Sequence, residues 1–217
     1  MRSLTEILIR QGLNDKVLSE RQLERIIGGG AARRYGLVNR ALKAAELIRI
    51  RRGLYVLPTK YRTDAPHPFA IAQALEPGSY ISFETALSAR TWIPERVRVT
   101  ASVVPGRKSA RLEHPLLGGF TFHPLAVHQE RFLELIERRP LGSQVALVAR
   151  PLRALMDLVT LRKLDWQGLA WITEGLRIDD LMLREITAAQ VQTLSGVYKQ
   201  KRPLNFLLAL ARELHLD

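Results

Sequence analysis

Apolar residues recur every three or four positions in three stretches near the start of the chain, and this spacing predicts three short helices. The first is expected over residues 3–11, with Ser3 as its N-cap. Ser19 begins the second helix, because Gln22 follows three residues later and completes a capping box. The third is expected over residues 31–45. The apolar faces of the three helices consist of Leu4, Ile7 and Leu8; of Leu23, Ile26 and Ile27; and of Leu37, Val38, Ala41, Leu42 and Ala45.

The pattern changes to alternation in the sequence ELIRIRRGLYVLP, residues 46–58. Apolar and basic residues alternate there, and the step Arg-Arg-Gly interrupts the run at residues 51–53. This alternation is typical of a half-buried hairpin, which we expect over residues 47–57. Three short helices followed at once by a two-stranded hairpin make up the winged helix-turn-helix arrangement. We therefore expect a winged helix-turn-helix DNA-binding domain over residues 1–62.

Three prolines between residues 58 and 68 predict a linker before a second domain. Beyond it, the patterns predict helices at 69–75, 82–91, 129–139, 151–163, 168–176, 180–194 and 203–214, and strands at 96–104 and 119–125. The expected fold class is α+β and mostly helical. It combines the N-terminal winged helix-turn-helix with a larger mixed α/β C-terminal domain over residues 66–217.

Composition narrows the classes of function. Hydrophobic residues make up 47% of the 217 residues and charged residues 25%, which is ordinary for a folded soluble protein. The absence of cysteine excludes disulfides, thiol catalysis and thiolate zinc sites. No apolar run approaches the roughly 18–20 residues that span a bilayer, and the first residues lack the apolar core of a signal peptide. We expect a cytoplasmic protein that does not bind a membrane.

The net charge of +12 is concentrated near the start of the chain. Residues 1–63 contain 14 Lys/Arg and 5 Asp/Glu, a net charge of +9. Residues 64–217 contain 19 and 16, a net charge of +3. A chain with one strongly basic end usually has a polyanionic partner. Double-stranded DNA is the expected partner.

The helix at 31–45 and the hairpin that follows supply the candidate DNA-binding side chains. Arginine and lysine bind phosphates or guanine edges, and asparagine reads adenine. Gly36 lets the helix backbone come close to a ligand, and arginine at a hairpin tip suits a phosphate or the minor groove. The candidates are Arg33, Arg34, Tyr35, Asn39, Arg40, Lys43, Arg49, Arg51 and Arg52.

Other motifs give no support for catalysis or metal binding. The three glycines at 28–30 follow no predicted strand and precede no Gly-Lys-Ser/Thr, so they are not a phosphate loop. The sequence HPLAVH at 123–128 is not a metal-binding helix, and GxSxG is absent. We expect Asp157 to be a paired or capping helix residue. No catalytic residue, metal site or cofactor is expected.

Three segments together resemble a known family. RRYGLVNRALKAAELIRIRRGLYVLP, HPFAIAQAL and PGSYISFETALSARTWIPE are similar to the AbiEi-type antitoxins of type IV, abortive-infection toxin–antitoxin systems. The resemblance is strongest over residues 20–100. It implies a bacterial protein whose winged helix represses its own operon at inverted repeats. Winged-helix regulators bind palindromic sites as two copies, so we expect a homodimer on the DNA. It also implies a C-terminal domain that neutralises a nucleotidyltransferase toxin without a cofactor. Neutralisation by contact and by enzymatic modification of the toxin both stay open.

The resemblance assigns DNA contacts to the helix at 33–43 and to Arg49, Arg51 and Arg52. It assigns no residue to toxin neutralisation. Two alternatives stay open at this point. One is a nucleic-acid-processing enzyme that a winged helix targets to its substrate, which would require clustered acidic residues. The other is a non-catalytic adaptor whose winged helix binds protein, for which nucleic-acid binding would show little dependence on salt.

Overall fold

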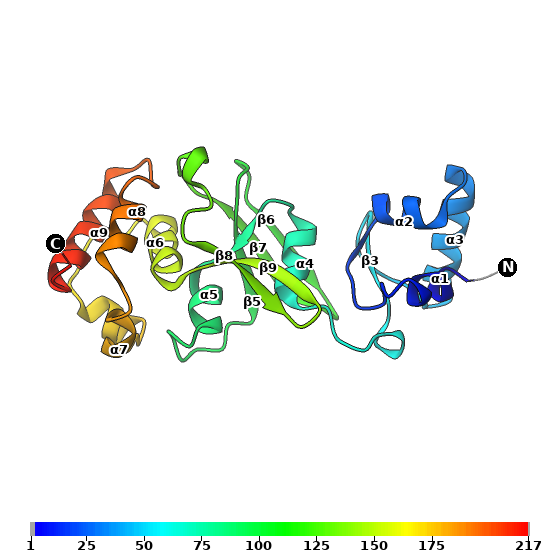
Figure 1. The fold of residues 1–217 in the computed structure, drawn as a ribbon, viewed down its shortest axis with the longest axis horizontal. Coiled ribbons are helices and arrows are strands. Elements are labelled where there is room, and N and C mark those ends of the chain that lie inside the picture. Colours follow the sequence, from blue (N-terminus) through cyan, green and yellow to red (C-terminus); the bar gives the residue numbers. More distant parts are fainter. Residues whose placement is uncertain (1–2, 217) are drawn as a thin grey trace. The chain divides into compact units, whose positions relative to one another are not determined.

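Three helices begin the chain in the computed structural model, which describes residues 3–216 (Figure 1). They are α1 (Leu4–Arg10), α2 (Glu20–Ile27) and α3 (Ala31–Lys43), as predicted. Complete capping boxes start α1 at Ser3 and α2 at Ser19. The helices share a core, which includes Leu4, Leu8, Leu18, Leu23, Ile27, Leu37, Val38, Ala41, Leu47, Tyr55 and Leu57.

The predicted hairpin is confirmed as β2 (Ile48–Arg51) and β3 (Leu54–Val56), which pair in antiparallel fashion. A third strand, β1 (Leu18–Ser19), pairs antiparallel to β3, so the strand order is β1-β3-β2. The sequence does not predict β1, because two residues are too few to show a period. A 3-10 turn at Thr59–Tyr61 and the predicted helix α4 (Pro68–Leu75) come next.

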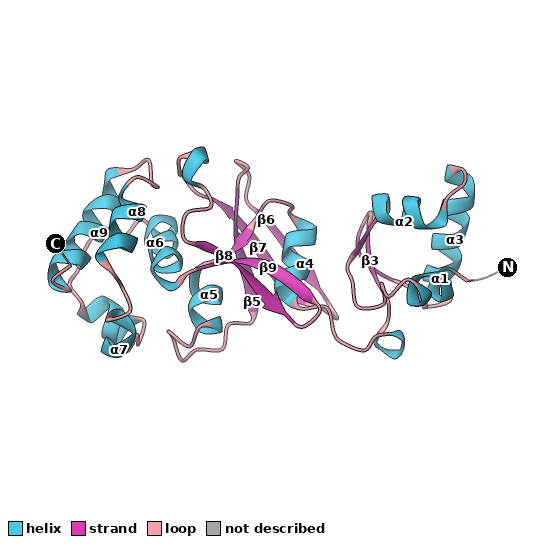
Figure 2. Cartoon of the chain, in the orientation of Figure 1, coloured by secondary structure: helices cyan, strands magenta, loops and turns pink. Residues whose placement is uncertain are grey.

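A mixed sheet with the order β6-β7-β5-β4-β9-β8 forms in the remaining chain (Figure 2). β5 pairs in parallel with β7 and β4 with β9, whereas the pairs β4–β5 and β6–β7 are antiparallel. The two strands predicted at 96–104 and 119–125 are confirmed as β5 and β7. In chain order the strands are β4 (Tyr80–Ile81), β5 (Val99–Val104), β6 (Ala110–His114), β7 (Gly118–Pro124), β8 (Ile136–Leu141) and β9 (Gln144–Ala149).

Helices cover this sheet and extend beyond it. α5 (Phe83–Ala89) packs on α6 (Pro151–Arg162) and on β5. α9 (Lys201–Glu213) packs on α6 and on α8 (Ala188–Ser195), and Figure 1 shows these three helices together. A π-helical turn at Trp171–Gly175 and the short helix α7 (Asp180–Leu183) join α6 to α8. The helices predicted at 82–91, 151–163 and 203–214 are confirmed as α5, α6 and α9.

Two predictions for this region are wrong. Residues 129–139 form a 3-10 turn at Gln129–Arg131 and then enter β8, instead of one helix. The segment predicted as a helix at 180–194 is two helices, because Thr187 and Gln190 form a capping box that starts α8. The expected mixed α/β character of the C-terminal domain is confirmed, although its sheet has six strands where the sequence predicts two.

Contacts divide the chain into two compact units. The first contains the residues up to 77 together with 140–145, and the second contains 78–139 together with 146 onwards. The predicted boundary between residues 62 and 66 falls within the first unit and stays a prediction. Within residues 3–216, no helix combines the length and the apolar character that crossing a bilayer requires.

The core of the second unit contains a buried ion pair between Arg153 and Asp157, one turn apart on α6. The guanidinium Nε donates to the carboxylate at 3.0 Å. Hydroxyl groups of Tyr80, Ser82 and Tyr198 also donate to Asp157, at 3.0, 2.7 and 2.8 Å. Asp157 is therefore a paired helix residue, as expected from the sequence.

Candidate nucleic-acid interface

The two faces of α3 have opposite character. Leu37, Val38 and Ala41 are buried in the core of the first unit. At about 100° per residue, the opposite face carries polar and basic side chains. Tyr35 is 72% exposed there, and Asn39 is partly exposed. The exposed basic residues of this helix are Arg33, Arg40 and Lys43.

Gly36 lies in the middle of the exposed face. A Cβ atom at this position would lie 3.5 Å from Nη1 of Arg40, so the Arg40 side chain lies back across the glycine. Because glycine has no side chain, the helix surface is recessed at this position, and the guanidinium of Arg40 lies over it. The structure brings Arg33, Asn39, Arg40 and Lys43 onto the exposed side of one helix, and we call these four residues the basic face.

Arg34 lies off the basic face. Its Nη1 is 2.7 Å from the carboxylate of Glu24 on α2, and its side chain is only 18% exposed. This ion pair joins α3 to α2. The structure therefore places Arg34, a predicted DNA-binding residue, in a contact between helices.

The hairpin separates its three arginines. All three are exposed, but they differ in their contacts. A register shift between Arg49 and Arg51 leaves Ile50 buried in the unit. Arg51 bonds to the carboxylate of Glu76 at 3.2 Å and to the carbonyl of Leu75, at the end of α4.

The hairpin turn is also close to an acidic side chain. Gly53 has a φ of 80°, which favours glycine. Its carbonyl accepts a hydrogen bond from the backbone N–H of Glu20 at 2.8 Å. A Cβ atom on Gly53 would lie 3.4 Å from Oε2 of Glu20, so a carboxylate lies beside the turn.

Most other carboxylates of the first unit are engaged within it. Glu6 accepts a hydrogen bond from the backbone N–H of Ser3, and Glu46 accepts one from Thr5 at 3.1 Å. Asp15 accepts hydrogen bonds from the backbone N–H groups of residues 63 and 64, at 2.8 and 3.0 Å. Glu24 is paired with Arg34. Within residues 3–216, no hydrogen bond or ion pair joins any of these four carboxylates to a side chain of the basic face.

α2 adds two basic residues that the sequence analysis did not include. Arg21 and Arg25 are both exposed and lie one helical turn apart. Their i, i+4 spacing, which places both on one side of an amphipathic helix, was the available signal. Within residues 3–216 there is no group of three His, Cys, Asp or Glu side chains that could hold a metal ion.

Comparison with known proteins does not assign the chain to a family. A scan of protein-family models gave no match, and no curated protein matched the chain.

Proposed function

We propose that the first unit is a winged helix-turn-helix that binds double-stranded DNA. Support comes from the order of its elements, in which α1, β1, α2 and α3 precede the hairpin of β2 and β3. In this arrangement α2 and α3 form the helix-turn-helix, α3 is the recognition helix and the hairpin is the wing. The observation that carries the proposal is the basic face of α3, which lies opposite the apolar face that packs in the core.

The chemistry of the basic face suits a major groove. This groove is about 12 Å wide and admits one α-helix. Asn39 has the donor and acceptor that adenine requires, and Arg40 has the paired donors that guanine requires. Arg33 and Lys43, toward the two ends of the face, are suited to phosphates on either side. Between them, the helix backbone can come closest to the DNA at Gly36, which has no side chain.

The wing has a smaller role in this proposal than the helix. Arg52 at the tip and Arg49 on β2 are exposed and are assigned to phosphates. Arg51 would have to exchange the carboxylate of Glu76 for a phosphate, so its net contribution is smaller than that of Arg52. Arg34 is assigned to helix packing through Glu24.

We further propose that the protein is a transcriptional repressor and the antitoxin of a bacterial type IV toxin–antitoxin operon. The resemblance to AbiEi-type antitoxins supports this role. Binding at inverted repeats requires two copies of the chain, related by the symmetry of the DNA. The second unit would then counteract a nucleotidyltransferase toxin, with or without a stable complex.

DNA recognition is tested by fluorescence anisotropy with a duplex from the promoter of the protein's own operon and with a random duplex. Asn39→Ala or Arg40→Ala should weaken binding to the promoter duplex by about 1–3 kcal/mol and have a smaller effect on the random one. Arg10→Ala, which removes an exposed positive charge from α1, is the control. Equal losses on both duplexes would show that these residues do not read bases.

The antitoxin role is tested by coexpression. The chain should restore the growth of cells that express the nucleotidyltransferase encoded beside it, and a chain truncated after residue 77 should not.

Degradation of DNA in the presence of a divalent cation would instead favour the nucleic-acid-processing enzyme. Binding to DNA that is independent of salt would favour the adaptor.

A further inference from the structure

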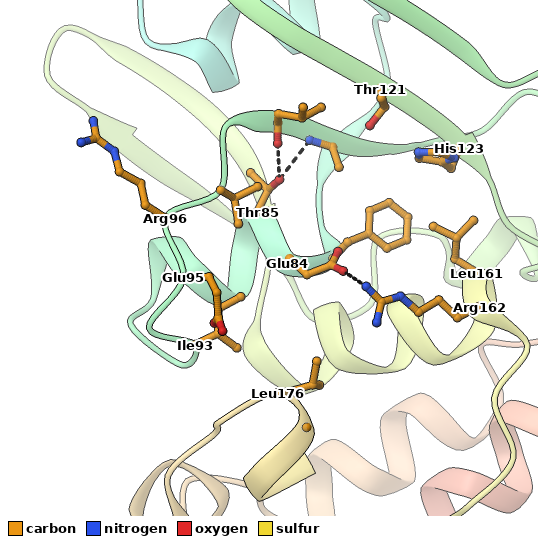
Figure 3. Close-up of a pocket in the computed structure, with 15 residues that line it drawn as sticks. Glu84, Thr85, Ile93, Glu95, Arg96, Thr121, His123, Leu161, Arg162 and Leu176 are labelled. Carbon is orange, nitrogen blue, oxygen red and sulfur yellow. Dashed lines mark hydrogen bonds and ion pairs between the residues drawn. The ribbon is translucent and has the colours of Figure 1, made fainter. Parts of the chain in front are cut away.

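The second unit contains a cavity of about 550 Å³. Figure 3 shows Thr121 and His123 on one of its walls, and Leu161 and Leu176 on the other side. Pockets that bind small molecules have volumes of roughly 300–1,000 Å³. The cavity therefore has room for one small molecule, and all of its lining residues belong to the second unit.

Apolar side chains form most of the surface. The parallel register of β5 and β7 pairs Ala101 with Thr121, which places both residues on the same face of the sheet. Val99 lies two positions before Ala101 and so shares that face. The remaining apolar lining residues are Phe83, Ile93, Val97, Leu161 and Leu176.

Two polar side chains on this face are uncommitted. Within residues 3–216, neither the hydroxyl of Thr121 nor the imidazole of His123 makes a hydrogen bond, and both side chains are partly buried. The hydroxyl of Thr85, by contrast, donates to Val99 at 2.9 Å and accepts from the N–H of Ala101 at 3.0 Å. Burial lowers the pKa of His123 from 6.5, against a smaller opposite effect of Glu84. The ring is therefore neutral at pH 7 and offers one donor and one acceptor.

The charged side chains around the cavity neutralise one another. Glu84 forms an ion pair with Arg162, which Figure 3 shows. Glu95 forms an ion pair with Arg177. The guanidinium of Arg96 points away from the other labelled side chains in Figure 3. The lining thus has two uncommitted hydrogen-bonding groups but no strong preference for a charged ligand.

Phe83 lies behind the wall of the cavity, because it is only 1% exposed. It has a φ of 56° at the start of α5, and such a conformation in a non-glycine residue costs on the order of 1–3 kcal/mol and often occurs at functional sites. Its ring centroid lies 5.5 Å from that of His123, with an interplanar angle of 86°. The buried ring of Phe83 therefore supports the imidazole of His123, which lines the open, mostly apolar cavity together with the hydroxyl of Thr121.

We propose that this cavity binds an uncharged heteroaromatic ring system with hydrogen-bonding groups at its edge, and that a nucleobase, in the form of a nucleoside, is its ligand. The flat ring packs against the aliphatic walls, while its polar edge bonds to Thr121 and His123. A nucleobase combines these two properties, since it has apolar faces and a rim of donors and acceptors. The proposal does not depend on DNA binding by the first unit.

Isothermal titration calorimetry of the full chain with adenosine, guanosine, cytidine and uridine tests the proposal. At least one nucleoside should bind saturably, and more tightly than indene, a ring of similar size without a polar edge. Thr121→Val combined with His123→Phe should weaken nucleoside binding roughly tenfold or more, because two hydrogen bonds are lost, and should leave the binding of indene within about twofold.

A second variant, Leu176→Trp, fills the cavity from the side opposite His123 and should abolish binding of both ligands. Leu116→Trp, at an exposed position that does not line the cavity, is its matched control and should leave both affinities unchanged. The far-UV circular dichroism of each variant checks that it is folded. The absence of saturable binding by every nucleoside up to about 10 mM would overturn the proposal, as would equal affinity for indene and all four nucleosides.

Discussion

Arg153 is a fully buried arginine whose hydrogen-bonding groups are used within the second unit. Besides Asp157, its guanidinium reaches the carbonyl of Glu134 at 3.0 Å and the hydroxyl of Tyr80 at 2.6 Å. Burial alone would lower the pKa of Arg153, but Asp157 and the two tyrosine hydroxyls together raise it above its ordinary value. Arg153 therefore stays charged, and it fixes the position of β4 relative to α6.

Removing one member of this pair should strongly destabilise the second unit. Arg153→Met leaves the Asp157 carboxylate buried without its counter-ion, which should lower the free energy of unfolding by about 3–5 kcal/mol. Asp165→Asn, which removes one partner of the exposed ion pair with Arg202, should lower it by less than about 1 kcal/mol. Urea denaturation measures both changes. Equal changes in the free energy of unfolding would show that the buried ion pair stabilises the protein no more than the exposed one.

His123 should make stability depend on pH below 6.5. Its pKa is lowered in the folded protein, so the unfolded chain binds more protons in the interval between the folded pKa and 6.5. The free energy of unfolding should therefore fall as the pH drops through that interval. Denaturation of the wild type and of His123→Gln at a series of pH values measures this. Parallel curves for the two proteins would contradict the assignment to His123.

At the scale of elements, the two faces of α3 have different roles: one stabilises the first unit, and the other is the proposed DNA-binding surface. Its apolar face lies in the core of the first unit, and its basic face has no role in that core. The periodicity of the sequence predicts both faces, because i, i+3 and i+4 neighbours share one side of a helix. It does not reveal that Arg34 is paired with Glu24, since that contact depends on how α2 and α3 meet.

Substitutions on the two faces of α3 should have different effects. Leu37→Ala creates a cavity in the core and should lower the free energy of unfolding of the first unit by about 2–5 kcal/mol. Lys43→Ala, on the exposed face, should change it by less than about 0.5 kcal/mol and should weaken DNA binding. Chemical denaturation and anisotropy on the same proteins separate the two quantities. A Lys43→Ala protein as unstable as Leu37→Ala would contradict the assignment of faces.

The strands of the second unit show where a sequence pattern is insufficient. β8 begins at Ile136 inside a stretch whose apolar residues also fit a helix, so periodicity alone does not distinguish the two. β9 has a buried apolar character that a short helix shares. What decides between them is pairing within the sheet, in which Ile81 of β4 meets Val148 of β9. Such long-range pairs are not visible in a single sequence.

At the scale of the whole molecule, the sequence predicts how charge is distributed along the chain, but not which charged side chains pair with one another. The net charge of +9 over residues 1–63 supports the proposed polyanionic partner. The sequence does not show that Arg51 pairs with Glu76 or that a carboxylate lies beside Gly53, because these partners come together only on folding. The cavity of the second unit was likewise missed, since its lining residues are scattered between positions 83 and 176.

The central claim is that DNA binds to the basic face of α3 and to the tip of the hairpin. The salt dependence of binding to a duplex tests it most directly. A variant that neutralises this surface is compared with one that removes the same charge from exposed positions of the second unit. The first carries glutamine at Arg33, Arg40, Lys43 and Arg52, and the control carries glutamine at Arg98, Arg138, Arg184 and Arg212.

Each phosphate contact adds about 0.9 to the slope of log K against log salt concentration. If the four substituted side chains contact phosphates, the first variant should lose about 3–4 units of slope relative to the wild type. The control variant should keep the wild-type slope, although its net charge is the same as that of the first variant. Equal slopes for the two variants would contradict the claim, because the protein would then bind DNA through its overall charge alone.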